Sequence, residues 1–178
     1  MKLKRYSHHV RRLVVFFIFS TLSFSSWAVA PVVALKLNFI EKIKNLENMG
    51  DELYFHITEY SSLSTPVHTL VPEYPINWVS AYLAEVKNVT LWQRALKEGE
   101  AVELAISLTE RDAPPWNLDD LVGTVKVKFR RDGKQLIQEW SSLTPYTVLQ
   151  PKPVKHPSNE KQFVLGEGSY QLGLILSE

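Results

Sequence analysis

Apolar and polar residues alternate along five stretches of the chain. A side-chain period of two is typical of a strand that buries one face, and its repetition favours antiparallel strands. One apolar and one polar face per sheet predict two sheets packed as a sandwich. The alternating stretches are residues 35–39, 53–58, 102–109, 125–130 and 171–177. Glycine-containing turns are expected between strands at 99–100, 132–133 and 166–168.

Two segments break this alternation. Residues 80–98 place apolar side chains at helical spacing, beginning with Leu83 and Val86, which predicts one or two short helical turns. The β-branched residues Val86, Val89 and Thr90 weaken the helical pattern. Residues 145–157 contain prolines at 145, 151, 153 and 157, and are expected to form an extended loop before a final hairpin.

The first 28 residues have the three-part plan of a secretory signal peptide. Basic residues without any acid come first, residues 13–24 are apolar, and a small, weakly polar segment follows. The apolar run is shorter than the roughly 20 residues that a membrane span needs. Cleavage after Ala28 fits the small-x-small rule, whereas cleavage after Ala30 leaves Pro31 beside the scissile bond. We expect a leader at 1–28 and one exported domain at 29–178, periplasmic or secreted; an uncleaved signal anchor is the alternative.

Charge and cysteine content narrow the class of protein. The chain carries 20 Lys and Arg against 19 Asp and Glu, and no cysteine. The leader holds five of the bases and none of the acids, so residues 29–178 have 15 bases against 19 acids, a net charge of −4. Collagenous, low-complexity and strongly basic nucleic-acid-binding chains are excluded. Disulfides, thiolate metal sites and a cysteine nucleophile are excluded as well.

Acidic residues gather at the predicted turns, where strands begin or end. Two acids at i and i+2, a stiff loop and then further acids aim several carboxylates into one space. Calcium takes about 6–8 oxygen ligands and tolerates irregular geometry, so this spacing suits a calcium site. The alternative is that these acids are solvated or cap turns. The acids concerned are Asp51, Glu110, Asp112, Asp119 and Asp120.

Two segments resemble the C2 domain family. Residues 35–58 (LKLNFIEKIKNLENMGDELYFHIT) are similar to that family's opening strand, acid-bearing loop and glycine-led second strand. Residues 104–127 (LAISLTERDAPPWNLDDLVGTVKV) resemble its later calcium loop, in which acids at i and i+2 precede an Asp, an aliphatic residue and Gly. The resemblance implies an all-β fold, an eight-stranded antiparallel β-sandwich with a short helical segment in one connection.

The resemblance also implies a set of metal ligands. They fall on Asn45, Asp51, Glu110, Asp112 and Asp120, with Asp119 able to take the place of Asp120. Asn45 stands where the family usually has Asp, and Glu110 is one methylene longer than the usual Asp. The implied cofactor is Ca²⁺, bridging loop carboxylates to lipid phosphate. Many domains of this fold have lost calcium and serve as interaction modules.

Candidate contacts with a partner lie on one strand and one loop. Lys126, Lys128 and Arg130 share a strand face, and such a basic stripe favours contact with anionic lipid headgroups. The alternative is a solvated edge face that discourages edge pairing. Trp116, in the stiff loop, is placed to insert at a membrane interface. An anionic membrane surface or a protein partner is expected, and no nucleic acid.

Enzyme motifs are missing from the sequence. There is no Gly-x-Ser-x-Gly, no His-Glu-x-x-His and no phosphate-binding glycine loop. His56 is expected on a sheet surface, and His68 in a proline-bounded loop. Glu110 and Asp112 would suit a carboxylate pair for glycoside chemistry, but nothing else indicates a sugar cleft.

We therefore expect an exported binding module and no enzyme. Its binding would depend on calcium and loop carboxylates, with an anionic membrane lipid or a protein as the partner. A calcium-independent interaction or structural module, and a small secreted hydrolase that uses the same acids, are the alternatives.

Overall fold

Two antiparallel sheets pack face to face as a β-sandwich. The computed structural model describes residues 30–44, 50–61, 64–112, 118–150 and 159–178. A short 3₁₀ helix, η1 (Ser80–Glu85), is the one helix among these residues. The strands are β1 (Val32–Lys42), β2 (Glu52–Ser61), β3 (Ser64–Val71), β4 (Trp78–Val79), β5 (Lys87–Ala95), β6 (Ala101–Glu110), β7 (Asp120–Asp132), β8 (Gln135–Ser142), β9 (Val148–Leu149), β10 (Glu160–Leu165) and β11 (Tyr170–Ser177).

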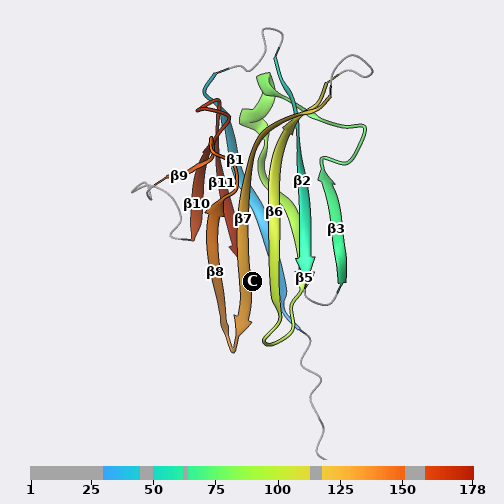
Figure 1. Cartoon of the computed structure of the whole chain (residues 1–178), viewed down its shortest axis with the longest axis vertical. Coiled ribbons are helices and arrows are strands. Elements are labelled where there is room, and N and C mark those ends of the chain that lie inside the picture. Colours follow the sequence, from blue (N-terminus) through green and yellow to red (C-terminus); the bar gives the residue numbers. More distant parts are fainter. Residues whose placement is uncertain (1–29, 45–49, 62–63, 113–117, 151–158) are drawn as a thin grey trace, which may run out of the picture.

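Strands distant in sequence are neighbours in the sheets. The five-stranded sheet has the order β5-β1-β11-β10-β9, and the six-stranded sheet has the order β3-β2-β6-β7-β8 with β4 paired to β2. Figure 1 shows β8, β7, β6, β2 and β3 side by side, with strands of the other sheet behind them. The long strands run from one end of the sandwich to the other, so the connections collect at two opposite ends.

Alternating side chains from both sheets form the core. Leu35 and Leu37 of β1 are fully buried, as are Leu104 and Ile106 of β6, and they belong to one hydrophobic cluster. Trp92 of β5 packs edge-on against Phe129 of β7, with ring centroids 5.5 Å apart, which joins the two sheets. Each of the five alternating stretches lies in a strand, so the predicted all-β sandwich is confirmed.

The strand count exceeds the expected eight. The described residues contain eleven strands, of which β4 and β9 have two residues each. Residues 80–98 hold one short helix, η1, at 80–85 and then a strand, β5, in place of further helical turns. Backbone pairing of β5 with β1 and burial of Leu91 against the core stabilise the extended form. β-branched Val89 and Thr90 suit a strand better than a helix.

β3 was also missed, since prolines at 66 and 72 suggested a loop around His68. It pairs with β2 on one side only, from Val71 to Ser64, and forms an edge of its sheet. Proline is tolerated in an edge strand because one side of that strand needs no N–H donor for a neighbour. His68 therefore lies on a strand, which corrects the expectation of a loop.

A buried polar contact links the sheets at the end opposite the acidic turns. Glu59 of β2 faces inward, accepts a hydrogen bond from Trp92 Nε1 at 2.8 Å and pairs with Arg94 at 3.3 Å. Arg94 also pairs with Glu100 at 2.7 Å. A buried carboxylate needs such partners to offset the loss of its hydration. No helix in the described residues is long and apolar enough to cross a bilayer.

Candidate functional site: the loop end

The start of β2, the end of β6 and the start of β7 lie together at one end of the sandwich. Glu110 of β6 pairs in register with Leu53 on one side and with Asp120 on the other. The turns that carry the predicted acids therefore meet, and Figure 1 shows this end at the top. We call it the loop end. Although the acids share this end, their side chains do not form one group.

Asp51 and Glu110 are buried beneath the loop end. Asp51 is 0% exposed and Glu110 is 4% exposed; Glu110 continues the inward-facing series of Leu104, Ile106 and Leu108. Asp51 accepts a hydrogen bond from the hydroxyl of Tyr170, and its backbone N–H donates to Ser80 Oγ at 3.0 Å. Asp51 thus ties β11 and η1 to the start of β2. The same burial removes Glu110 from contact with a soluble substrate.

Asp112 and Asp119 are two predicted ligands that a hydrogen bond joins. The backbone N–H of Asp112 donates to Asp119 Oδ1 at 3.2 Å, and the Tyr54 hydroxyl donates to Asp119 Oδ2 at 2.8 Å. Burial, and then the bond to Asp119, raise the pKa of Tyr54. Asp112 Oδ2 is shielded from solvent and has no hydrogen-bond partner among the described residues.

A complete metal site is not assembled by these residues. Within the described ranges, no group of three or more His, Cys, Asp or Glu side chains is arranged to hold a metal ion. Asp120 is exposed at the start of β7. Asn45 and Trp116 lie outside the described residues. Within the expected set, Asp112 and Asp119 are joined by a hydrogen bond.

Arg111 organises the loop that follows β3. Its guanidinium lies 4.7 Å from the centroid of the Tyr54 ring and 5.0 Å from that of Tyr74. It also donates to the backbone oxygens of Pro75 at 3.2 Å and Ile76 at 3.4 Å. These contacts hold the loop on the outer face of β2 and fix how it presents Tyr74. The sequence pattern did not identify Arg111, because both its ring partners are distant along the chain.

The segment 72–86 displays large apolar side chains to solvent. Tyr74 is 71% exposed, Ile76 61%, Val79 41% and Tyr82 65%. We call these four residues the loop surface. Two of these residues, Val79 and Tyr82, also line a groove of about 470 Å³ between β4, η1 and β5. Leu118 and Leu121 are also exposed near the start of β7. The sequence pattern did not identify this surface. Its one signal in the sequence is a set of apolar residues isolated in a polar segment that contains prolines.

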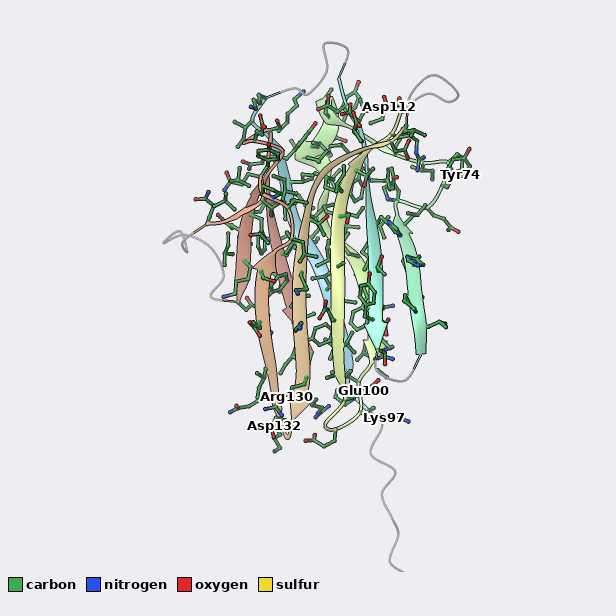
Figure 2. All side chains as sticks on the ribbon, in the orientation of Figure 1. Tyr74, Lys97, Glu100, Asp112, Arg130 and Asp132 are labelled. Carbon is green, nitrogen blue, oxygen red and sulfur yellow. The ribbon has the colours of Figure 1, made fainter. Side chains whose placement is uncertain are left out.

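The basic stripe of Lys126, Lys128 and Arg130 extends away from the acids of the loop end. Lys126 and Lys128 pair with Glu103 at 3.8 and 3.1 Å, and Arg130 pairs with Asp132 at 3.5 Å. Figure 2 shows Arg130 and Asp132 at the end opposite Asp112. The stripe lies on the outer face of β7, as predicted, but neighbouring carboxylates offset part of its charge and its Arg130 end points away from the loop end.

Comparison with known proteins identifies no relative. No protein-family model, no curated protein and no solved structure matches the chain. The fold itself defines the class of protein, which is an antiparallel two-sheet β-sandwich with an apolar loop surface. The C2 resemblance stays a prediction from two sequence segments.

Proposed function

We propose that this chain is an exported binding module that docks on a protein partner through the loop surface. The observation that carries the proposal is the exposure of Tyr74, Ile76, Val79 and Tyr82 on one continuous segment. Contiguous exposed apolar side chains on a soluble domain mark interaction sites. Tyrosine is enriched in such sites because its rigid ring buries a large area and its hydroxyl stays hydrated.

The part of the loop surface at residues 74–76 is held in place before any partner arrives. Arg111 stacks on Tyr74 and bonds the backbone at 75 and 76, so little conformational freedom remains to be lost on binding. The adjoining groove supplies a recess for an inserted side chain of the partner. Glu73 and Glu85 flank the apolar residues in sequence, which gives the surface a polar, acidic rim.

Site-specific photocrosslinking in cells tests this function. A photoreactive amino acid is placed at Tyr74 or Tyr82, and at Tyr60 or Ile137 as matched exposed controls towards the other end. We expect an adduct of discrete mass from the loop-surface positions alone, reduced by the second substitution Ile76→Ser. Equal adducts at the control positions, or none at the loop surface, would contradict the proposal.

Calcium-dependent binding to anionic lipid is the second candidate. The observation in its favour is the Asp112–Asp119 pair, with Asp112 Oδ2 shielded and without a partner among the described residues. A calcium ion would add ligand oxygens from water and lipid phosphate to these carboxylates. The net charge of −4 for residues 29–178 opposes contact with an anionic surface unless a cation intervenes.

Co-sedimentation with phosphatidylglycerol-containing vesicles, in millimolar calcium or in chelator, tests this candidate. We expect calcium-dependent sedimentation and a calcium-induced rise in melting temperature, both lost in Asp112→Asn and kept in the control Glu139→Gln. Saturation at about 100 times the dissociation constant stabilises the fold by about 2.7 kcal/mol. Weaker sedimentation of the double variant Lys126→Gln, Lys128→Gln would assign a role to the basic stripe. Sedimentation in chelator would reject the calcium requirement.

A further inference from the structure

Two histidines face each other on the outer surface of the six-stranded sheet. His56 lies on β2 opposite Leu70, and His68 lies on β3 opposite Thr58, so the two imidazoles are diagonal neighbours across the strand pair. His56 Nε2 is 3.1 Å from His68 Nδ1, and the ring centroids are 5.2 Å apart with planes inclined by 34°. The two ring nitrogens therefore point towards one another.

The surroundings leave this pair accessible. His68 is exposed and His56 is half-buried. Ser107 of β6 stands opposite His56, and Thr58 Oγ1 lies 3.2 Å from His68 Nδ1. Each of these two neighbours provides a hydroxyl group and carries no charge.

We propose that His56 Nε2 and His68 Nδ1 together bind one divalent transition-metal ion of the class that prefers imidazole, copper(II) or zinc. Neutral imidazole is the commonest metal ligand among side chains, and affinity for such sites follows the order in which copper(II) exceeds zinc. The remaining coordination positions would be taken by water, because no third His, Cys, Asp or Glu in the described residues completes the site.

The separation of the two nitrogens fits a shared ion. Metal–nitrogen bonds of about 2.0–2.1 Å place two ligand nitrogens about 2.9 Å apart at a right angle and about 3.4 Å apart at the tetrahedral angle. The observed 3.1 Å lies between these values. Because two such bonds together exceed 3.1 Å, an ion bound by both nitrogens would lie to one side of the line that joins them, and both rings would turn so that their lone pairs face it.

Metal binding would connect an edge strand to its sheet. β3 pairs with β2 alone, so its hydrogen bonds are held from one side. An ion coordinated by one side chain from each strand would raise the free energy needed to separate β3 from β2. This consequence is independent of the loop surface, which lies on the segment after β3.

Copper(II) titration followed by electron paramagnetic resonance tests the proposal. The 178-residue chain is expressed and purified without a polyhistidine tag. We expect one ion per chain with a two-nitrogen signature, reduced to one nitrogen and at least about tenfold weaker binding in His56→Gln and in His68→Gln. Zinc should bind the same site more weakly and compete with copper.

Controls separate this site from other histidines. His156→Gln removes one imidazole elsewhere and should leave stoichiometry, affinity and spectrum unchanged. Binding through His8 and His9 of the leader would persist in both His56→Gln and His68→Gln, and would overturn the proposal. So would the absence of saturable copper binding, which would show that the two rings share a hydrogen bond only. Far-ultraviolet circular dichroism confirms that each variant is folded.

Discussion

At the scale of single residues, Arg111 determines how the loop surface is presented. It touches two aromatic rings and two backbone carbonyls, all from segments remote from it in sequence. Its effect is thus on one loop, whereas Asp51, which binds Tyr170 and Ser80, supports the interior of the same end. Asp51 and Arg111 are 60 positions apart in the chain, yet both stabilise the loop end, Asp51 from its interior and Arg111 on its surface.

Replacing Arg111 with Ala should loosen the loop without unfolding the domain. Each exposed cation–π contact is worth about 0.5–1 kcal/mol, so we expect a loss of about 1 kcal/mol in unfolding free energy. Hydrogen exchange at Ile76 should accelerate, and crosslinking from Tyr74 should fall. Arg111→Lys keeps the charge but not the planar stack, and should be intermediate. Unchanged exchange in Arg111→Ala would contradict the role assigned to this residue.

The histidine pair predicts a pH dependence. Burial, and then the charge of a protonated His68, lower the pKa of His56. His56 therefore binds fewer protons in the native state than in the unfolded state. The free energy of unfolding has its full value above pH 6.5 and falls as the pH decreases below 6.5. Nuclear magnetic resonance titration should show a pKa for His56 below 6.5, the ordinary value. In His68→Gln that pKa should rise partway, since burial remains. A pKa above 6.5 would rule out the assigned causes.

At the scale of elements, the alternation of apolar and polar residues predicted the strands that bury one face. It failed where the sequence also had helical spacing, as in β5, or prolines, as around β3. The stretch at 102–109 became β6 because Leu104, Ile106 and Leu108 meet the opposite sheet. β5 was mistaken for helical turns, because Val86 and Val89 have the spacing of a helix, whereas Val89 and Leu91 have the spacing of a strand, and a short window does not separate the two periods. Pairing with β1, which is distant in sequence, decided in favour of the strand.

The buried contact between β2 and β5 makes a prediction at this scale. Glu59→Ala would leave Arg94 and Trp92 without their carboxylate partner. Removing one member of a fully buried pair costs about 3–5 kcal/mol, and because the Arg94 side chain is 33% exposed we expect a smaller loss of about 2–3 kcal/mol.

Urea unfolding measures this effect. Glu59→Gln, which keeps the acceptor for Trp92 but not the charge, should lose less than Glu59→Ala. Equal losses in the two variants would show that packing, and not the polar contact, accounts for the role of Glu59.

At the scale of the whole molecule, β1 joins the chain's two halves by pairing with both β5 and β11. A single core should therefore unfold as one unit. Leu104→Ala, at a fully buried position of β6, should cost about 2–5 kcal/mol. Far-ultraviolet circular dichroism and tryptophan fluorescence should report the same shifted midpoint. Ile137→Ala, on the exposed outer face of β8, should change stability by less than about 0.5 kcal/mol.

The acidic turns show how far a candidate site can be predicted from sequence. Antiparallel strands return the turns at residues 51, 110 and 120 to one end, so their proximity followed from strand order and length. The direction of each side chain could not be predicted in this way, because a shift of one residue in register moves a side chain to the opposite face of the sheet. Glu110 faces the core, while Asp119 bonds Tyr54 on the other side of β2.

The sequence by itself determined the all-β class, the position of five of the eleven described strands and the glycine-containing turns, because these depend on local alternation and on glycine conformation. The tertiary structure decided which acids are buried, which rings Arg111 meets and that His56 and His68 lie 3.1 Å apart. These features arise from register between strands that are not adjacent in sequence. Register is set by packing of the whole core, and no local pattern records it.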